Sequence, residues 1–275
     1  MAIPKIVHFL WMSKEKDENT LRCLESWKKH LGGYEIREWN SETFPYNDFV
    51  WTKEATKAKK WAYVTDYFRL WVLYNYGGIY LDADVLLKGN FDRFLKHELF
   101  IATEFTVQLA PHCIGSVAKH PFIKQCLDFY QNRNFVSNGI LQMIPIPRIM
   151  TYYLYKTYGV ESVTNFNSEP IMLKNGIAIY SDNYFTIDIS DGNNVGIHLG
   201  LGSWRDDTTS DNPIYLNNLE QYFIKRFIIK DKKVMGIKFY YLFNFILYGW
   251  LLRLILQYKL KIKNCKLIMD IGKLL

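Results

Sequence analysis

The sequence predicts an α/β domain with a mixed central sheet flanked by helices. Near the N-terminus, an apolar strand pattern over residues 5–11 is followed by a helical pattern over 17–33 and an alternating strand pattern over 34–39. Further along, residues 58–87 give a helix, a glycine pair and a short β-prone run in direct succession. Strands that alternate with helices are typical of a sheet covered by helices.

The helix expected within residues 58–87 is marked by small and apolar side chains that recur every three or four positions and so share one face. Asp66 and Arg69 are three residues apart and therefore neighbours on the helix surface. Gly77 and Gly78 are expected to end the helix, because glycine tolerates the left-handed conformation of a C-terminal cap. The residues expected on the shared face are Ala58, Trp61, Ala62, Thr65, Phe68 and Val72.

Two carboxylates, Asp82 and Asp84, follow the apolar run of residues 79–81. In an extended chain, residues two apart point to the same side, so we expect the carboxylates to converge just past the C-terminal end of a strand. Ligands bind at this edge in α/β sheets, and oxygen ligands suit a hard cation such as Mn²⁺ or Mg²⁺. The alternative is a surface turn with two solvated aspartates.

The full stretch resembles the DXD-motif glycosyltransferases that bind a nucleotide sugar. This family includes yeast initiating mannosyltransferases, bacterial capsule and lipooligosaccharide sugar transferases and, more distantly, clostridial glucosylating toxins. Residues 3–11 resemble the family's first strand, and His198 with Ser203 and Trp204 resembles its C-terminal H-x-x-x-x-S-W element. The resemblance covers residues 3–205 and implies a GT-A-like nucleotide-binding fold. The matching motif residues are Asp66, Arg69, Leu73, Gly77, Gly78, Tyr80, Asp82 and Asp84.

The resemblance also implies roles at a metal site. Asp84 would bind Mn²⁺ or Mg²⁺ directly, Asp82 would contact the ribose and the metal, and His198 would be a further ligand of the metal or of phosphate. His198 stands between Ile197 and Leu199, so a buried core histidine is the alternative.

For the donor, the resemblance implies that Asp66 and Arg69 bind the sugar hydroxyls, with Arg69 also near the diphosphate. The alternative for this pair is a surface ion pair. Tyr80 would line the same pocket and Trp11 would stack on the nucleobase, although both could be core residues. Ser203 and Trp204 would contact the β-phosphate.

The family transfers sugars with retention of configuration, which requires an enzymic nucleophile or front-face attack assisted by the leaving phosphate. Glu104 is the nearest candidate nucleophile by position, and we favour front-face attack. The expected function is transfer of a sugar from a UDP- or GDP-linked donor to a glycan acceptor, lipid-linked in bacterial surface polysaccharide synthesis. Two alternatives stay open: a toxin-like enzyme that modifies a protein side chain, and a non-catalytic basic membrane-binding protein.

The charge of the chain is concentrated at its C-terminal end. Residues 221–275 contain twelve Lys and Arg and two Asp, a balance of +10 within a net charge of +7. We therefore expect a catalytic domain over residues 1–215 and a basic amphipathic helical extension over 216–275. The extension is predicted to bind an anionic membrane surface, with a buried helix as the alternative. Nucleic acid is not an expected partner.

The N-terminus shows no signal-peptide pattern, and the four cysteines have neither disulfide nor metal spacing. A cytoplasmic protein, peripheral on the inner face of the cell membrane, is the expectation. The remaining expected elements are strands over residues 99–103, 160–166, 177–180 and 195–204, helices over 121–130 and 149–158, and irregular segments over 44–51, 108–115 and 140–147.

Overall fold

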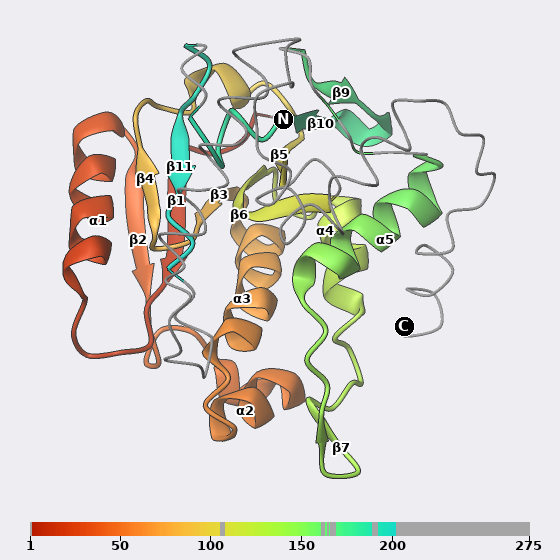
Figure 1. The fold of residues 1–275 in the computed structure, drawn as a ribbon. Helices are drawn as coiled ribbons and strands as arrows, with labels where there is room; N and C mark the ends of the chain where they lie inside the picture. The colour runs from red at the N-terminus through yellow and green to blue at the C-terminus, as the bar shows by residue number, and fades with distance from the viewer. Residues whose placement is uncertain are drawn as a thin grey trace, which may run out of the picture. The chain divides into compact units, whose positions relative to one another are not determined.

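The computed structural model describes residues 2–104, 108–160, 163, 165, 169–188 and 192–201 (Figure 1). These residues confirm the expected α/β fold with a mixed central sheet flanked by helices. The predicted extension over residues 216–275 and its boundary with the catalytic domain lie outside them.

The central sheet has seven strands in the order β2-β1-β3-β6-β5-β10-β9. β1 pairs in parallel with both β2 and β3, β6 runs antiparallel between β3 and β5, and β10 is parallel to β5. The strands are β2 (Glu35–Trp39), β1 (Ile6–Leu10), β3 (Gly78–Leu81), β6 (Gln108–Ser116), β5 (Leu99–Glu104), β10 (Ile177–Tyr180) and β9 (Ile171–Met172).

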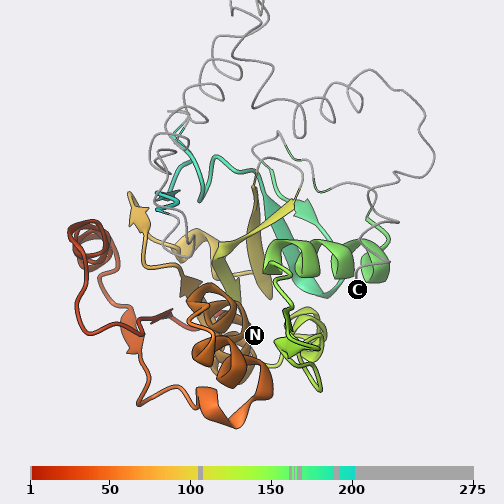
Figure 2. The same ribbon diagram turned by 60° about the horizontal axis from the view of Figure 1, so that its bottom comes forward.

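Helices cover both faces of this sheet, because alternate residues of each strand point in opposite directions. Ile79 and Leu81 of β3 belong to a core with Trp27 of the first helix. Tyr80 between them packs against Phe68 of the third helix on the opposite face. The helices are α1 (Glu18–His30), α2 (Val50–Lys57), α3 (Trp61–Tyr76), α4 (Pro121–Asp128) and α5 (Ile146–Tyr158); α3, α4 and α5 lie next to one another along the sheet (Figure 2).

Two smaller sheets complete the described fold. β4 (Val85–Leu87) pairs antiparallel with β11 (Gly196–His198), and β7 (Val136–Ser137) forms a hairpin with β8 (Ile140–Leu141). Three short 3₁₀ turns cover Tyr46–Asp48, Asp92–Phe94 and Lys174–Gly176. Among the described residues, no helix combines the length and apolar character that a membrane span requires.

The glycine pair ends α3, as expected. Gly77 is the C-cap with φ 65°, and its N–H donates to Leu73 O at 2.9 Å. An added Cβ would lie 2.7 Å from Ala118 N at Gly77 and 2.6 Å from Ile6 O at Gly78. The backbone therefore turns from α3 into β3 in a space that only glycine fits.

The segment over residues 108–115 is a correction: it forms most of β6, in the middle of the sheet, and is not irregular. The pairing with β5 shifts register between Ile101 and Ala102, whose partners are Ile114 and Ala110. Pro111 lies in the resulting bulge, where a residue without an N–H is tolerated. Gly115 lies outside the bulge and pairs with Phe100 and Ile79.

The helix expected from Ala58 onward is also corrected. The chain forms two helices there, because Lys59 adopts φ 56° between α2 and α3. Trp61, expected on the shared face, is 43% exposed at the start of α3. Residues 140–147 contain β8 and the start of α5, residues 44–51 hold a 3₁₀ turn and the start of α2, and most of the strand expected over 160–166 lies outside the described residues.

Candidate active site

The two acids of the D-x-D pattern follow β3 at its C-terminal end, as expected, but they converge through a turn. Val85 N–H donates to Asp82 O at 3.0 Å, so residues 82–85 form a tight turn and not an extended chain. Asp82 N–H donates to His112 O at 2.9 Å, which fixes the turn to the bulge of β6. One ligand atom each from Asp82, Asp84 and His198 lies within 4.8 Å of the other two.

The Arg69 guanidinium lies at the centre of the first half of the site, which we call the guanidinium cluster (Asp66, Arg69, Tyr80 and Asp82). Its Nη2 lies 3.0 Å from Asp66 Oδ1 and 3.4 Å from Asp82 Oδ1. Its Nη1 donates to Pro111 O at 2.8 Å, a carbonyl in the β6 bulge. Tyr80 lies under the guanidinium, 4.7 Å from ring centroid to Cζ, and its hydroxyl donates to Asp82 Oδ1.

Burial governs the protonation of this cluster. Asp66 is 7% exposed, and its burial raises the pKa to about 6 although Arg69 favours the charged form. Burial would lower the pKa of Arg69, but the negative charges of Asp82 and Asp66 outweigh that effect and raise it. The pair is therefore a buried ion pair and not the surface pair considered as an alternative.

The second half of the site, which we call the imidazole cluster, comprises Asp84, Glu104, His112 and His198. β11 pairs with β4 so that His198 stands opposite Val85, directly after Asp84. His198 Nε2 lies 3.4 Å from Asp84 Oδ1, and Leu201 N–H donates to Asp84 Oδ2 at 3.1 Å. Burial opposes ionisation of both partners, but their mutual attraction prevails: it raises the pKa of His198 and lowers that of Asp84.

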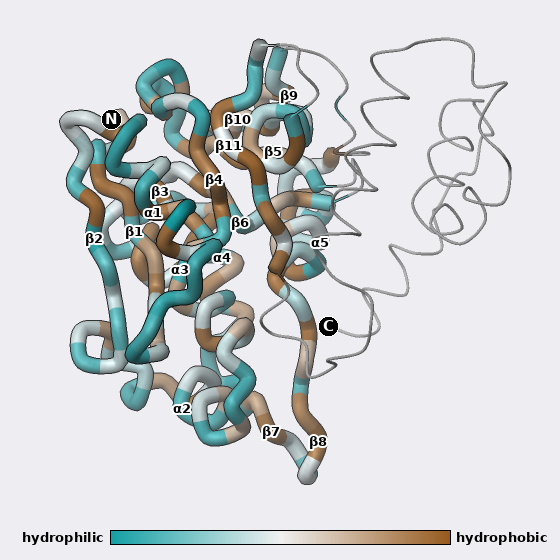
Figure 3. The backbone as a smooth tube through the Cα atoms, turned by 60° about the vertical axis from the view of Figure 1, so that its left-hand side comes forward, coloured by the Kyte–Doolittle hydropathy of each residue, from teal (hydrophilic) through white to brown (hydrophobic). Residues whose placement is uncertain are grey.

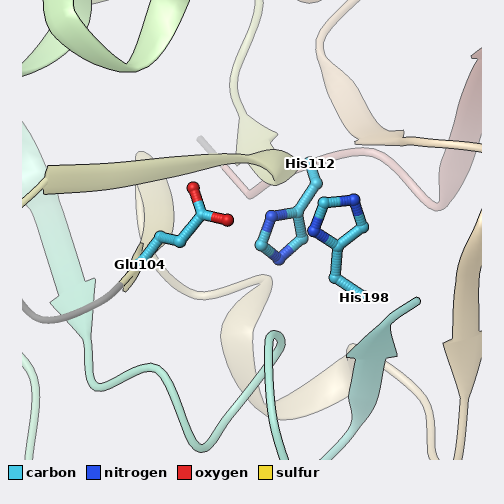
Figure 4. A group of neighbouring side chains, drawn as sticks. All are labelled: Glu104, His112 and His198. Atoms are coloured by element: carbon cyan, nitrogen blue, oxygen red, sulfur yellow. The ribbon is translucent and has the colours of Figure 1, made fainter. Parts of the chain in front are cut away.

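Glu104 and His112 complete the imidazole cluster (Figure 4). The two imidazole rings stack with centroids 4.1 Å apart and planes at 19°, and the Glu104 carboxylate points toward them. Burial, followed by the positive charge of His198, holds the pKa of His112 well below its usual value. The neutral ring donates from Nε2 to Phe185 O at 3.2 Å. Burial also raises the pKa of Glu104.

The charges of these side chains do not cancel. Asp66, Asp82, Asp84 and Glu104 face two cationic groups, Arg69 and His198. The excess of negative charge is what a divalent cation would neutralise, and carboxylate oxygens with one imidazole nitrogen suit Mn²⁺. Asp82, Asp84 and His198 therefore fit a metal site.

A second group, Glu104, His112 and His198, also brings ligand atoms within 4.8 Å of one another. An imidazole lone pair lies in the plane of its ring, so one ion must lie near both ring planes to bind both histidines. The rings are stacked at 4.1 Å, and they would have to rotate before one ion could do so. The geometry favours the aspartate site, with Glu104 and His112 beside it.

The other predicted residues have different positions. Trp11 follows β1, donates from Nε1 to Glu15 O at 3.1 Å, and packs against the core on one side. Its stacking on a nucleobase stays a prediction. Ser203 and Trp204 lie outside the described residues. His112 was missed from the sequence, and a signal that could have found it is Pro111 directly before it, which lies in the bulge of β6.

Comparisons with known proteins agree with the motif. The family model of a glycosyltransferase sugar-binding region containing the DXD motif matches residues 17–101. This region of the chain is thus similar to that family. The match includes the guanidinium cluster and both acids, while Glu104, His112 and His198 lie beyond it.

Among curated proteins, inositol phosphoceramide mannosyltransferase 3 of Schizosaccharomyces pombe is 30% identical over 130 residues, covering 45% of this chain and 36% of that protein. Inositol phosphoceramide mannosyltransferase 1 of the same organism is 25% identical over 166 residues, covering 56% of this chain and 52% of that protein. The chain thus spans between about a third and half of the length of these two relatives. A solved structure, PaToxG glycosyltransferase, aligns with a TM-score of 0.42 at 17% identity, covering 56% of this chain and 69% of that one.

Proposed function

We propose that this chain is a metal-dependent glycosyltransferase that moves a sugar, with retention of configuration, from a UDP- or GDP-linked donor to a lipid-borne acceptor. The observation that carries the proposal is the convergence of Asp82, Asp84 and His198 on one point beside the buried Asp66–Arg69 pair. A surface turn with two solvated aspartates would not gather these groups, because their side chains would face water.

The metal, Mn²⁺ or Mg²⁺, would be held by Asp82, Asp84 and His198, and it would stabilise the departing diphosphate as a Lewis acid. Arg69 holds Asp66 and Asp82 in fixed positions through Nη2, so that these carboxylates can orient sugar and ribose hydroxyls. Tyr80 fixes Oδ1 of Asp82, and Arg69 Nη1 donates to Oδ2 at 3.5 Å, so the carboxylate that a metal would share is held at both oxygens.

Retention is proposed to follow front-face attack. Glu104, the candidate nucleophile, points its carboxylate toward His112 and His198 (Figure 4), and its ligand atom lies within 4.8 Å of theirs, so it is held within the imidazole cluster. In front-face attack the leaving phosphate accepts the proton of the acceptor hydroxyl, so no enzymic nucleophile is needed. The preorganised charges of the site would then stabilise the departing diphosphate.

The lipid-borne acceptor is supported by the names of the relatives, which concern inositol phosphoceramide. They do not point to a bacterial surface polysaccharide, the acceptor that the sequence suggested. A protein side chain is the alternative acceptor, and acceptor assays separate the two: sugar would be found on lipid in one case and on protein in the other.

The test is release of nucleoside diphosphate from a panel of nucleotide sugars with and without Mn²⁺. We expect one donor to be hydrolysed with Mn²⁺, and Asp84→Asn to lose at least about a hundredfold in rate while the variant remains folded. Asp128→Asn, which removes an exposed acid paired with Lys124 on α4, is the matched control. Release by no donor with either metal, or full activity of Asp84→Asn, would refute the proposal.

A further inference from the structure

The β7–β8 hairpin presents apolar side chains to solvent. Asn138 and Gly139 form its two-residue turn, both with positive φ, at 50° and 75°. Ile140, next to the turn, is 66% exposed, and Met143 beyond it is 50% exposed. Figure 3 shows the hairpin as a hydrophobic segment at the same end of the molecule as α2. A two-stranded hairpin is marginally stable in water, so apolar residues at its tip point to a partner.

The base of the hairpin is firmly held. Phe135 packs edge-on against Trp51 of α2, with ring centroids 5.1 Å apart, and lies 5.2 Å from Tyr63 of α3. Val136 N–H donates to Glu54 Oε2 at 2.9 Å, and Gln142 N–H donates to Phe135 O at 2.8 Å. The exposed tip is therefore presented on a fixed support.

The support carries basic side chains beside the apolar tip. Val50, Lys53, Glu54 and Lys57 follow at three- and four-residue spacing and so share one face of α2. Lys53 and Lys57 are exposed, and the Glu54 carboxylate on that face is bound to the hairpin. Exposed basic or aromatic residues close to these elements in the sequence are Lys59, Trp61, Arg133 and Arg148, with Glu42 and Asp48 as acidic residues before α2.

We propose that the hairpin tip, the basic face of α2 and Trp61 form a surface that docks on an anionic lipid bilayer. Apolar side chains at the tip suit the acyl chains of a bilayer, and the tryptophan and lysines around them suit its headgroup region. A second copy or a protein partner would gain little from this tip, because a stable protein interface needs about 800 Å² from each side. The positive charges of Lys53 and Lys57 beside the tip favour anionic lipid headgroups over uncharged ones.

The surface adjoins the guanidinium cluster. Ile146 N–H donates to Asp66 Oδ2 at 3.3 Å, and Ile146 lies six positions after Ile140, at most about 22 Å of extended chain. Along α3, Trp61 lies five residues before Asp66, an axial rise of about 7.5 Å. Docking would hold the guanidinium cluster, which is proposed to bind the donor sugar, near the bilayer. The use of this geometry to reach a lipid-borne acceptor rests on the proposed function, whereas the docking itself does not.

The experiment places an environment-sensitive fluorophore on Ile140→Cys in the full chain, with Cys265→Ser to limit labelling. Cys23, Cys113 and Cys126 are buried. Met172→Cys on β9 is the matched control, because Met172 is 54% exposed and belongs to another element. Vesicles of phosphatidylcholine are compared with vesicles that also contain phosphatidylserine. The label reports the surroundings of its own residue, whatever residues 222–275 do.

We expect a blue shift at residue 140 with anionic vesicles and none at residue 172. Lys53→Glu with Lys57→Glu should weaken that response about tenfold, and Lys28→Glu with Lys29→Glu on α1 should leave it unchanged. An unshifted label at residue 140, an equal shift at residue 172, or an equal shift with uncharged vesicles would overturn the proposal. A shift that follows protein concentration without vesicles would overturn it in favour of a second copy. None of these readouts depends on sugar transfer.

Discussion

The two halves of the candidate site neutralise their carboxylates in different ways. In the guanidinium cluster, Arg69 holds Asp66 and Asp82 with a charge that no accessible pH removes. In the imidazole cluster, His198 balances Asp84 with a charge that a proton carries and can take away. An incoming divalent cation can displace a proton but cannot displace a guanidinium. The first half is therefore a fixed framework that offers Asp82 to a metal, and the second is where a proton would leave as the metal binds.

The largest effect is expected when the fixed charge is removed. Arg69→Met leaves Asp66 and Asp82 without their shared partner, and breaking a buried ion pair in this way costs about 3–5 kcal/mol in the free energy of unfolding. Arg69→Lys should lose less stability but most of the activity, because a point charge cannot hold two carboxylates and Pro111 O together. Denaturant unfolding and donor hydrolysis measure the two quantities.

The control for this prediction is Arg37→Met, which breaks a half-exposed pair with Glu35 on β2. Exposed pairs contribute about 0–1 kcal/mol, so its stability should stay near that of the wild type. If Arg69→Met unfolds at the same denaturant concentration as Arg37→Met, Arg69 is not the framework of the first half.

The same division explains how far the site could be predicted. The guanidinium cluster comes from residues 66–82, where helical spacing, a glycine cap and a strand end are all visible in the chain. The imidazole cluster brings together residues 84, 104, 112 and 198, whose proximity depends on strand pairing. His198 was expected only through the resemblance. His112 reaches the site because β6 shifts register at a bulge, and register across a sheet is set by tertiary packing that one sequence does not display.

The second prediction concerns pH, in protein freed of metal by a chelator. The pKa of His198 is raised from 6.5 to about 9, because the charge and hydrogen bond of Asp84 outweigh burial. A group whose pKa is higher in the folded than in the unfolded protein stabilises the fold by its full amount at pH values below its unfolded-state pKa. This stabilisation is lost as the pH rises through its folded-state pKa. The free energy of unfolding should thus fall between pH 6.5 and about 9, by roughly 2 kcal/mol.

The His198→Gln variant tests the assignment of this pH dependence. It cannot carry the proton, so its unfolding free energy should change little over that pH range. Asp66 has a pKa of about 6, so it is mostly ionised at pH 6.5 and changes little above about pH 7, while Arg69 remains charged throughout the range. If the free energy of unfolding still declines in His198→Gln, another group is responsible, and the imidazole cluster does not differ from the guanidinium cluster through a removable charge on His198.

A third, smaller effect is expected at Glu104. Carboxylates beside a metal-binding histidine orient its ring, and their loss costs about tenfold or more in metal affinity. Glu104→Gln should lower Mn²⁺ affinity about tenfold in a calorimetric titration. Its unfolding free energy should stay the same or rise, since a buried charge is removed. Glu42→Gln, at an exposed position before α2, is the control, and equal affinities in the two variants would separate Glu104 from the metal site.

The smallest effect tests whether the two halves are energetically separate. Tyr80→Phe removes the hydroxyl that donates to Asp82 and should cost about 1 kcal/mol in the free energy of unfolding. Because Tyr80 lies 4.7 Å from the Arg69 guanidinium and shares Asp82 with it, the double variant with Arg69→Lys should deviate from additivity by about 0.5 kcal/mol or more. The double variant with His198→Gln should be additive, since His198 bonds to Asp84 and not to the Tyr80 hydroxyl. Coupling of equal size in both cycles would mean that Asp82 transmits changes across the whole site. A cation could then alter the guanidinium cluster as well, and the framework would not be fixed.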